Sequence, residues 1–193
     1  RIILVEMGVK TDEIELRESI KPFDVDLYFL GNHPTVNDIA KSDNWDIVKN
    51  LTEIVCTYMV LDTISRRGGE YDRVFKLSGR YWLTDEFDWV AHHENPDAVV
   101  FAAARSSQFD PAMTGGIKQQ YMSRLWSFPG NKIEAIRDTY QAMMLAVQIY
   151  YNNQHYVDIE HLLHLYSAKY PVVELDRIGV SGHLGPNGTL VTD

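Results

Sequence analysis

The sequence predicts an α/β fold with a mainly parallel central sheet, and its pattern, length and composition support that class. In the first half, short apolar runs that suit buried strands alternate with longer runs that have helical spacing. Strands joined by helices lie parallel, because the helix carries the chain back across the sheet before the next strand begins. The length of 193 residues and the hydrophobic content of 45% suit one domain, residues 1–193, with a substantial core.

The expected strands are apolar runs bounded by turn-forming residues. They are residues 2–6, 26–30, 73–77, 97–104 and 172–180. Residues 120–128 alternate loosely between apolar and polar side chains, so an antiparallel strand is expected there. The glycine-rich stretch 181–188 is expected to be a polar loop, and His92 and His93, just before Asn95-Pro96, are expected on a surface loop.

The expected helices have apolar residues at the three-to-four spacing that gives a helix one buried face. They are residues 11–20, 43–67, 132–151 and 159–166. Thr11 or Asp12 is the candidate N-cap of the first and Asp158 of the last, and Gly68-Gly69 ends the second. Cys56 falls within the second helix, where we expect a buried and unreactive thiol.

Composition, charge and motifs exclude several classes of function. The formal net charge is −9, whereas surfaces that bind nucleic acid or anionic membranes need a basic footprint. No run approaches the about 20 apolar residues that span a bilayer, and a single cysteine provides no disulfide framework. The sequence has no G-x-G-x-x-G, P-loop, G-x-S-x-G or Cys/His metal spacing. We therefore expect a cytoplasmic protein without a transmembrane segment that binds no nucleic acid; the oligomeric state is left open.

The most informative segment is residues 74–84, where an apolar strand breaks at a glycine between two cations. Lys76 and Arg80 flank Ser78 and Gly79. Open α/β sheets bind ligands where strands end, and glycine within a strand pattern often marks close backbone approach. The guanidinium, the ammonium, the hydroxyl and the backbone amide together suit a phosphate or a carboxylate. The alternative is that the two cations form ordinary surface ion pairs with nearby acids: Asp72, Asp85, Glu86 or Asp88.

Later residues provide further candidates. Asp158 or Glu160 could act as a base or orient an acceptor hydroxyl. The alternative is the acidic first turn that helices commonly have. His183, between Gly182 and Leu184, could donate to a phosphate or ligate a metal, or it could be a solvent-exposed loop histidine.

In this order, the segments resemble the GT-A fold of nucleotide-sugar glycosyltransferases. The first strand and loop, residues 2–8 with Glu6, correspond to the base-binding segment of that family. Residues 78–80 fall where the family has a metal-binding D-x-D, residues 158–160 at its late acidic motif, and residues 181–183 at its histidine loop. The run Lys-Leu-Ser-Gly-Arg-Tyr-Trp, residues 76–82, is also similar to one found in bacterial and viral glycosyltransferase-like proteins.

The resemblance implies a three-layer GT-A-like sandwich and a hexosyltransferase-type enzyme. A nucleotide-diphosphate sugar would be the donor, and a carbohydrate or another hydroxyl compound the acceptor. It implies catalytic roles for Asp158 and Glu160, and donor binding by a set that spans the whole chain: Glu6, Lys76, Ser78, Gly79, Arg80, Tyr81 and His183.

The sequence departs from the family at the metal site. Ser-Gly-Arg is a poor metal ligand set, so Arg80 and Lys76 are expected to neutralise the diphosphate directly. No tightly bound cofactor is expected. A divalent ion, Mn²⁺ or Mg²⁺, remains open through Asp85, Asp88 or His183. Tyr81 and Trp82 are either stacking surfaces for a sugar or base, or core residues. The alternatives are a non-catalytic carbohydrate- or nucleotide-binding module of the same fold, or a nucleotidyltransferase-like α/β enzyme.

Overall fold

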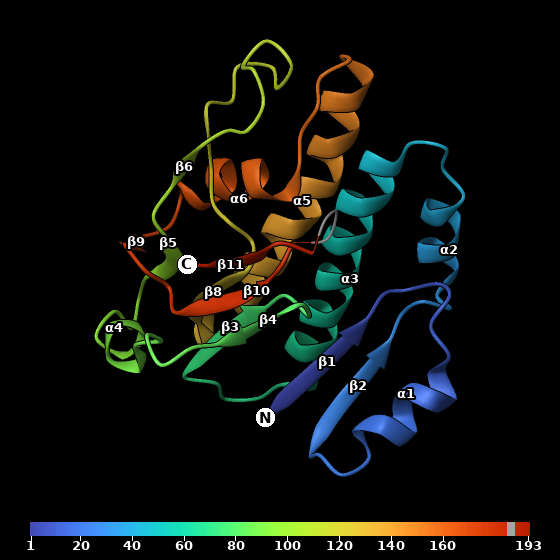
Figure 1. Cartoon of the computed structure of the whole chain (residues 1–193), viewed down its shortest axis with the longest axis vertical. Helices are drawn as coiled ribbons and strands as arrows, with labels where there is room; N and C mark the ends of the chain where they lie inside the picture. Colours follow the sequence, from blue (N-terminus) through green and yellow to red (C-terminus); the bar gives the residue numbers. More distant parts are fainter. Residues whose placement is uncertain (185–187) are drawn as a thin grey trace.

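The central sheet of the chain is mixed rather than mainly parallel. A computed structural model describes residues 1–184 and 188–193, and it confirms the α/β class (Figure 1). The sheet joins four elements in the order β3 (Arg73–Leu77), β8 (Leu125–Pro129), β5 (Val99–Ala102) and β9 (Val172–Leu175). β8 is antiparallel to both neighbours, and only β5 and β9 pair in parallel.

The segment between β5 and β8 explains why the parallel prediction was wrong. It holds only a short hairpin, β6 (Arg105–Ser106) with β7 (Gln119–Gln120), and turns. Without a crossover helix the chain re-enters the sheet at the same end where β5 left it, so β8 runs antiparallel to β5. The run 120–128, expected to be antiparallel, therefore has the right direction, but its main strand starts later, at Leu125.

The N-terminal segment forms a parallel pair of its own. β1 (Ile2–Glu6) and β2 (Val25–Phe29) are joined by α1 (Glu13–Ile20), which Asp12 caps through bonds from the backbone of Ile14 and Glu15. α2 (Pro34–Ala40) was not predicted. Its first residue is a proline, which suits the first helical position, and the ring of His33 caps it.

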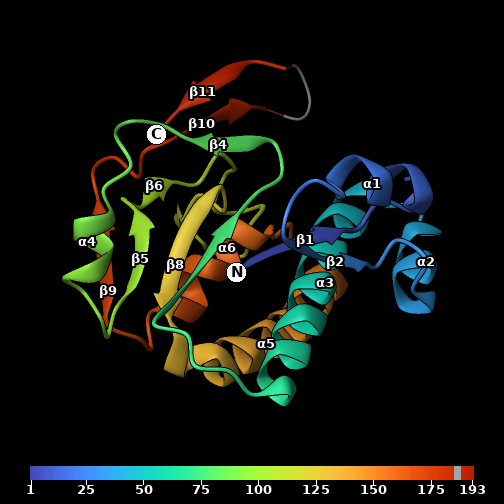
Figure 2. The ribbon, with the colours of Figure 1, turned by 90° about the horizontal axis from the view of Figure 1, so that it is seen from below.

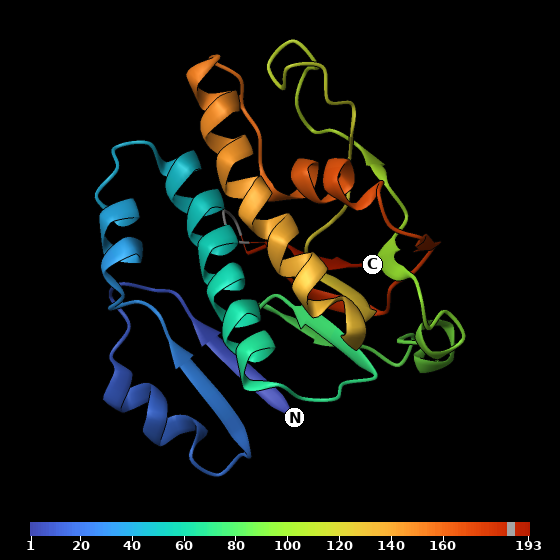
Figure 3. The ribbon, with the colours of Figure 1, turned by 180° about the vertical axis from the view of Figure 1, so that it is seen from behind.

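Three helices cover one face of the central sheet. α3 (Trp45–Arg67), α5 (Ile133–Asn152) and α6 (Ile159–Ser167) lie close to the predicted ranges, and a 3₁₀ turn, η1 (Gly130–Lys132), leads into α5. α3 and α5 pack side by side, as Figure 3 shows. Their buried side chains and those of α6 meet one face of the sheet in the main core, to which Ile54, Phe101, Trp126, Tyr140, Met143 and Leu162 belong.

A second, smaller sheet covers the opposite face, so the molecule has three layers (Figure 2). It consists of β4 (Tyr81–Leu83), β10 (Val180–His183) and β11 (Leu190–Thr192), all antiparallel. On this side a short helix, α4 (Trp89–His93), packs against Phe75 of β3 and Ser127 of β8. Between the two sheets a second core forms from apolar residues that include Val100, Leu125, Ile178 and Val180.

The predicted last strand and tail loop are corrected by this second sheet. Residues 172–180 were predicted to be one strand. They contain β9 and the first residue of β10, which belong to different sheets, because the chain turns at Gly179. Gly179 has φ +72°, and a Cβ there would lie 2.3 Å from the backbone of Phe87. Ser181 to His183, expected in a loop, belong to β10. Residues 185–187 of that predicted loop lie outside the described residues.

His92 and Cys56 are both buried. The prediction of a surface loop for His92 was wrong: the residue is 1% exposed in α4, and its Nδ1 lies 2.8 Å from Oγ of Ser127. Burial and the charge of Arg73 lower the pKa of His92 to about 4. The buried thiol of Cys56 is confirmed, and burial raises its pKa to about 12. Across residues 1–184 and 188–193, none of the helices has both the length and the apolarity to cross a bilayer.

Candidate functional site

The predicted site begins where β3 ends. The backbone N–H of Ser78 donates to the carbonyl of Arg124, which extends the β3–β8 pairing by one bond. A tight turn follows, closed by the N–H of Tyr81 donating to the carbonyl of Ser78 at 3.0 Å, and the chain then enters β4. This turn joins two polar groups of side chains: one lies under the helices and the other lies on the exposed sheet.

Lys76 is the centre of the group under the helices. Its ammonium donates to Glu53 Oε1 of α3 at 2.6 Å, to Ser78 Oγ at 2.8 Å and to the carbonyl of Ser123 at 2.9 Å. These acceptors use the three donors of the ammonium. Lys76 and Glu53 keep only 18% and 21% side-chain exposure. The cation is therefore paired, but with a helix residue rather than with the nearby acids that the sequence suggested.

Glu160 joins the same group through Ser123. The hydroxyl of Ser123 donates to Glu160 Oε1 at 3.1 Å, while its carbonyl accepts from Lys76. Burial, and then the negative charge of Asp158, raise the pKa of Glu160, whereas the charge of Lys49 acts in the opposite direction. The structure thus brings a predicted cation and a predicted carboxylate together from distant parts of the sequence. A carboxyl group of raised pKa can exchange a proton with a hydroxyl at a pH nearer neutrality.

Asp158 has a structural role that accounts for its position. It caps α6 by accepting from the N–H of His161 at 3.0 Å, and its Oδ1 also lies 2.8 Å from His161 Nδ1. The other ring nitrogen of His161 lies 2.9 Å from Ser107 Oγ, which ties the loop after β6 to the helix. Asp158 is 3% exposed. Of the two carboxylates, Glu160 is the one that keeps a partly exposed side chain.

The exposed group forms because β4 pairs with β10. Tyr81 lies opposite Gly182, and the N–H of His183 donates to the carbonyl of Arg80 at 3.3 Å. The ring of His183 lies 5.7 Å from that of Trp82, which is 47% exposed. Tyr81 instead packs partly buried against the second core. The strand pairing therefore places Arg80, Trp82 and His183, predicted from two separate segments, near one another on the small sheet.

Arg80 itself is exposed. Within residues 1–184 and 188–193, its side chain makes no hydrogen bond or ion pair, and it lines neither of the two cavities described below. Gly79 is also open: a Cβ built there would meet nothing within 4 Å. No other part of the described protein approaches this glycine closely, so the close approach expected there is left to a ligand. The side chain of Arg80 and the backbone of Gly79 both face open space.

Glu6 has local partners. Its Oε1 accepts from the N–H of Gly8 at 2.6 Å and from Thr11 Oγ1 at 2.9 Å, which fixes the loop after β1. The carbonyl of Gly8 in turn lies 2.3 Å from where a Cβ on Gly31 would be, so the loops after β1 and β2 meet. Among the described residues, no hydrogen bond joins Glu6 to Lys76 or to Glu160.

The residues considered for a metal lie apart. Asp88 caps α4 through bonds from Val90 and Ala91. Asp85 lines a polar cavity of about 640 Å³ that also contains Asp193, whose carboxylate is paired with Arg105 and Arg124. His183 Nδ1 lies 3.0 Å from the carbonyl of Gly188. In the part of the chain that the structure describes, His, Cys, Asp and Glu side chains form no group of three that could hold a metal ion.

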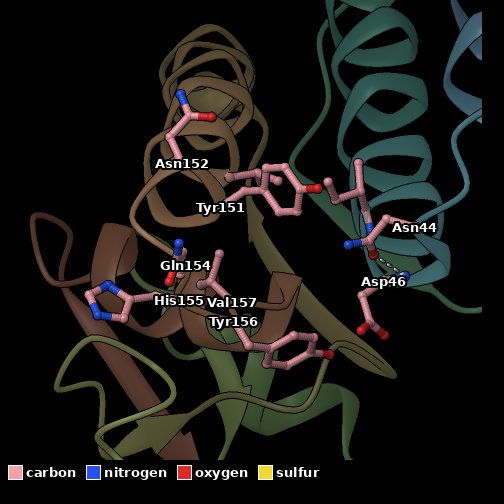
Figure 4. A pocket seen from close by; sticks show the side chains of 10 residues that line it. Asn44, Asp46, Tyr151, Asn152, Gln154, His155, Tyr156 and Val157 are labelled. Atoms are coloured by element: carbon pink, nitrogen blue, oxygen red, sulfur yellow. Dashed lines mark hydrogen bonds between the residues drawn. The ribbon is translucent and has the colours of Figure 1, made fainter.

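A second cavity, of about 590 Å³, was not predicted from the sequence (Figure 4). It lies between the first turn of α3 and the end of α5 with the segment that follows. Its polar and aromatic lining includes Asn44, Asp46, Tyr151, Gln154 and Tyr156. The start of α3 at Trp45 and the end of α5 at Asn152 form it, so no local pattern signals it. The one local sign, a cluster of tyrosine, asparagine and histidine at 150–156, resembles an ordinary helix end.

Comparison of the chain with models of known protein families, with curated proteins and with solved structures found no match. The functional assignment therefore depends on the geometry of the chain itself.

Proposed function

We propose that the chain is a glycosyltransferase of the hexosyltransferase type with a GT-A-like fold, which moves a sugar from a nucleotide-diphosphate donor to a hydroxyl acceptor. The observation that carries the proposal is the hydrogen-bond chain from Glu53 through Lys76 and Ser123 to Glu160 at the end of β3. Fixed positive charge and a carboxyl group of raised pKa, a few atoms apart, are the two chemical elements that the transfer needs.

The leaving diphosphate is held on the open side of the turn after β3. Arg80 follows Gly79 in this turn, and its side chain has no protein partner among the described residues. The backbone N–H of His183 donates to the carbonyl of Arg80, which places the two residues opposite each other. A guanidinium can bind two phosphate oxygens at once, and its charge compensates the negative charge that develops as the sugar–phosphate bond breaks. Exposed Trp82 provides a stacking face for the sugar or the base.

Lys76 is assigned a supporting role to Arg80. Its ammonium uses all its donors within the protein, so direct contact with a phosphate requires it to exchange the Ser78 hydroxyl or the Glu53 carboxylate for a ligand oxygen. Where it exchanges Glu53, its positive charge becomes available at the carboxyl end of β3, whereas the intact pair with Glu53 is close to neutral. That charge replaces part of what a bound cation supplies in a metal-dependent site.

Glu160 is assigned the proton transfer. Its raised pKa keeps it a competent base for an acceptor hydroxyl near neutral pH, and Ser123 fixes its orientation. Asp158 is assigned to holding the first turn of α6, because its carboxylate is already bonded to His161 and is buried.

A binding module of the same fold without catalysis is the second candidate. It is favoured by the same saturation of Lys76, because a fully bonded ammonium stabilises the fold without any ligand. Transfer or hydrolysis of a nucleotide sugar distinguishes an enzyme from such a module.

Calorimetric titration with UDP and GDP, each with and without Mn²⁺, tests the proposal. We expect saturable binding of at least one of them, with a matching rise in the unfolding temperature, since a ligand confined to the folded state stabilises it. If neither UDP nor GDP binds, with or without Mn²⁺, the assignment as a glycosyltransferase is contradicted. A preference for nucleoside triphosphates over nucleotide sugars would instead favour a nucleotidyltransferase.

A further inference from the structure

The cavity between the start of α3 and the end of α5 has the chemistry of a sugar site. Its volume of about 590 Å³ falls within the range of small-molecule sites. Figure 4 shows Asn44 and Asp46 on the α3 side, facing Tyr151 and Tyr156 from the other side. The lining contains neither lysine nor arginine. A phosphate or carboxylate ligand would therefore meet Asp46 without a lysine or arginine to compensate its charge, which makes an anion a poorer ligand than a neutral one.

The remaining lining suits a neutral polyol. Aromatic rings stack against the C–H faces of sugar rings, and amide groups donate and accept at neighbouring hydroxyls. Tyr151 is 46% exposed and offers such a face. Asn152 and Gln154 supply amides beside it. Their flexible hydrogen bonding and the single carboxylate match hydroxyl groups better than they match an apolar ligand.

The backbone at Gln154 closes α5. Gln154 has φ +60° and is the one non-glycine residue with positive φ within residues 1–184 and 188–193. The N–H of Gln154 donates to the carbonyl of Tyr151, and the N–H of His155 donates to the carbonyl of Tyr150, which is the pattern in which helices commonly end at a left-handed residue. This helix end holds the amide side chain of Gln154 in the cavity lining.

The cavity is connected to the proposed catalytic carboxylate through Tyr156 and Asn50. Asn50 Nδ2 donates to the carbonyl of Asp46 at 2.9 Å, and its Oδ1 accepts from the N–H of Ile159, the first residue of α6. Tyr156, in the cavity wall, bonds to Asn50, and burial, followed by the negative charges of Asp158, Asp46 and Glu160, raises the pKa of Tyr156. One buried amide thus separates the cavity from the turn that carries Glu160.

We infer that this cavity binds a neutral saccharide and serves as the outer part of the acceptor site, where it holds one sugar unit while the reactive hydroxyl of a neighbouring unit reaches Glu160. The acceptor role rests on the proposed glycosyl transfer, but saccharide binding in the cavity does not. No charged group of the ligand is required, and no divalent ion takes part.

Saturation-transfer NMR of the full chain with lactose, maltose, cellobiose and chitobiose at millimolar concentration tests the inference. We expect at least one of these disaccharides to bind. Binding should weaken about fivefold or more in Tyr151→Ala, which loses the stacking face. It should also weaken in Gln154→Gly, which removes the side chain but relieves the positive φ, so this variant should be at least as stable as the parent chain. Leu145→Ala, an exposed position of α5 outside the cavity lining, is the matched control and should bind normally.

Two results overturn the inference: no binding of any of the four disaccharides, or binding that both cavity variants leave unchanged. Titration of the same sample with UDP and GDP separates this inference from the proposed function. Nucleotide binding without saccharide binding contradicts the acceptor cavity alone. Saccharide binding without nucleotide binding supports the cavity and contradicts the proposed transferase.

Discussion

Lys76 and Glu160 both bind Ser123, Lys76 through its carbonyl and Glu160 through its hydroxyl. The ammonium of Lys76 donates to the carbonyl of Ser123 at 2.9 Å, and the hydroxyl of Ser123 donates to the Glu160 carboxylate at 3.1 Å. A strand, a loop and the first turn of a helix are thereby held together by one serine. The position of the proposed base is therefore set by the strand that carries the proposed diphosphate site.

Replacing Glu160 should separate catalysis from binding. Glu160→Gln keeps the shape and the bond from Ser123 but removes the base, so we expect turnover of a nucleotide sugar to fall by about a hundredfold or more with little change in nucleotide affinity. Asp158→Asn, which can still cap α6, is the matched control and should retain most of the activity. Equal loss of turnover in both variants would contradict the assignment of the base to Glu160 alone.

The raised pKa of Glu160 also predicts how stability depends on pH. The folded state holds the proton to higher pH than the unfolded state, so this residue's contribution is full below the ordinary glutamate pKa and is lost as pH rises through the folded pKa. Glu160→Gln should therefore gain stability relative to the parent chain as pH rises. Urea unfolding of both proteins across that range measures this, and a difference that does not vary with pH would count against the raised pKa.

His92 should destabilise the protein in acid. Its folded pKa of about 4 lies below the usual 6.5, so the stability it contributes is present above 6.5 and is lost as pH falls toward 4, where the unfolded chain binds a proton that the folded chain does not. The loss is at most about 3 kcal/mol. In His92→Gln, urea unfolding should show a smaller fall in stability between about pH 7 and about pH 5. An unchanged slope would show that His92 does not titrate in this way.

Breaking the Lys76–Glu53 pair should cost more than removing both charges. Lys76→Met leaves the Glu53 carboxylate without its cation, and we expect a loss of about 3 kcal/mol, because both side chains are mostly buried. Adding Glu53→Gln should recover a large part of that loss. Chemical denaturation of the two single variants and the double variant forms a mutant cycle, and strictly additive effects would mean that the pair is not coupled.

Gly79 tests whether a ligand approaches the turn after β3. A Cβ there meets nothing within 4 Å, and the residue has no positive φ, so Gly79→Ala should leave the unfolding temperature unchanged or slightly raised. If the diphosphate lies against the backbone amide, the added methyl group should still weaken nucleotide binding. Unchanged affinity would place the ligand elsewhere. Gly68→Ala is not a suitable control because Gly68 has φ +62°.

The local features of the fold were predictable, whereas the pairings between distant segments were not. Asp12 and Asp158 cap helices as expected, and β1 and β3 have the predicted bounds, because those signals lie within a few residues. The mixed sheet depends on the missing crossover before β8, which the apolar pattern alone does not reveal. The split at Gly179 was missed because apolar residues resume at Ile178 and Val180 after Asp176 and Arg177, which resembles the continuation of one strand.

The same limit applies to the site. The sequence identified Lys76, Ser78 and Glu160 as candidates, and the structure brings them together. It did not identify Glu53 or Ser123, since their roles follow from how α3 and the loop before β8 pack over β3. Nor could it indicate that Lys76 would be bonded within the protein while Arg80 stays open to solvent.

The most direct measurement of the central claim is nucleotide affinity in Arg80→Ala. If the guanidinium compensates the charge of the diphosphate, the affinity for UDP or GDP should fall at least about tenfold with no change in unfolding temperature, because the side chain has no partner in the described part of the chain. The control is Arg66→Ala, which removes a different exposed arginine, on α3; this variant should bind the nucleotide as tightly as the parent chain. Undiminished binding by Arg80→Ala would contradict the account.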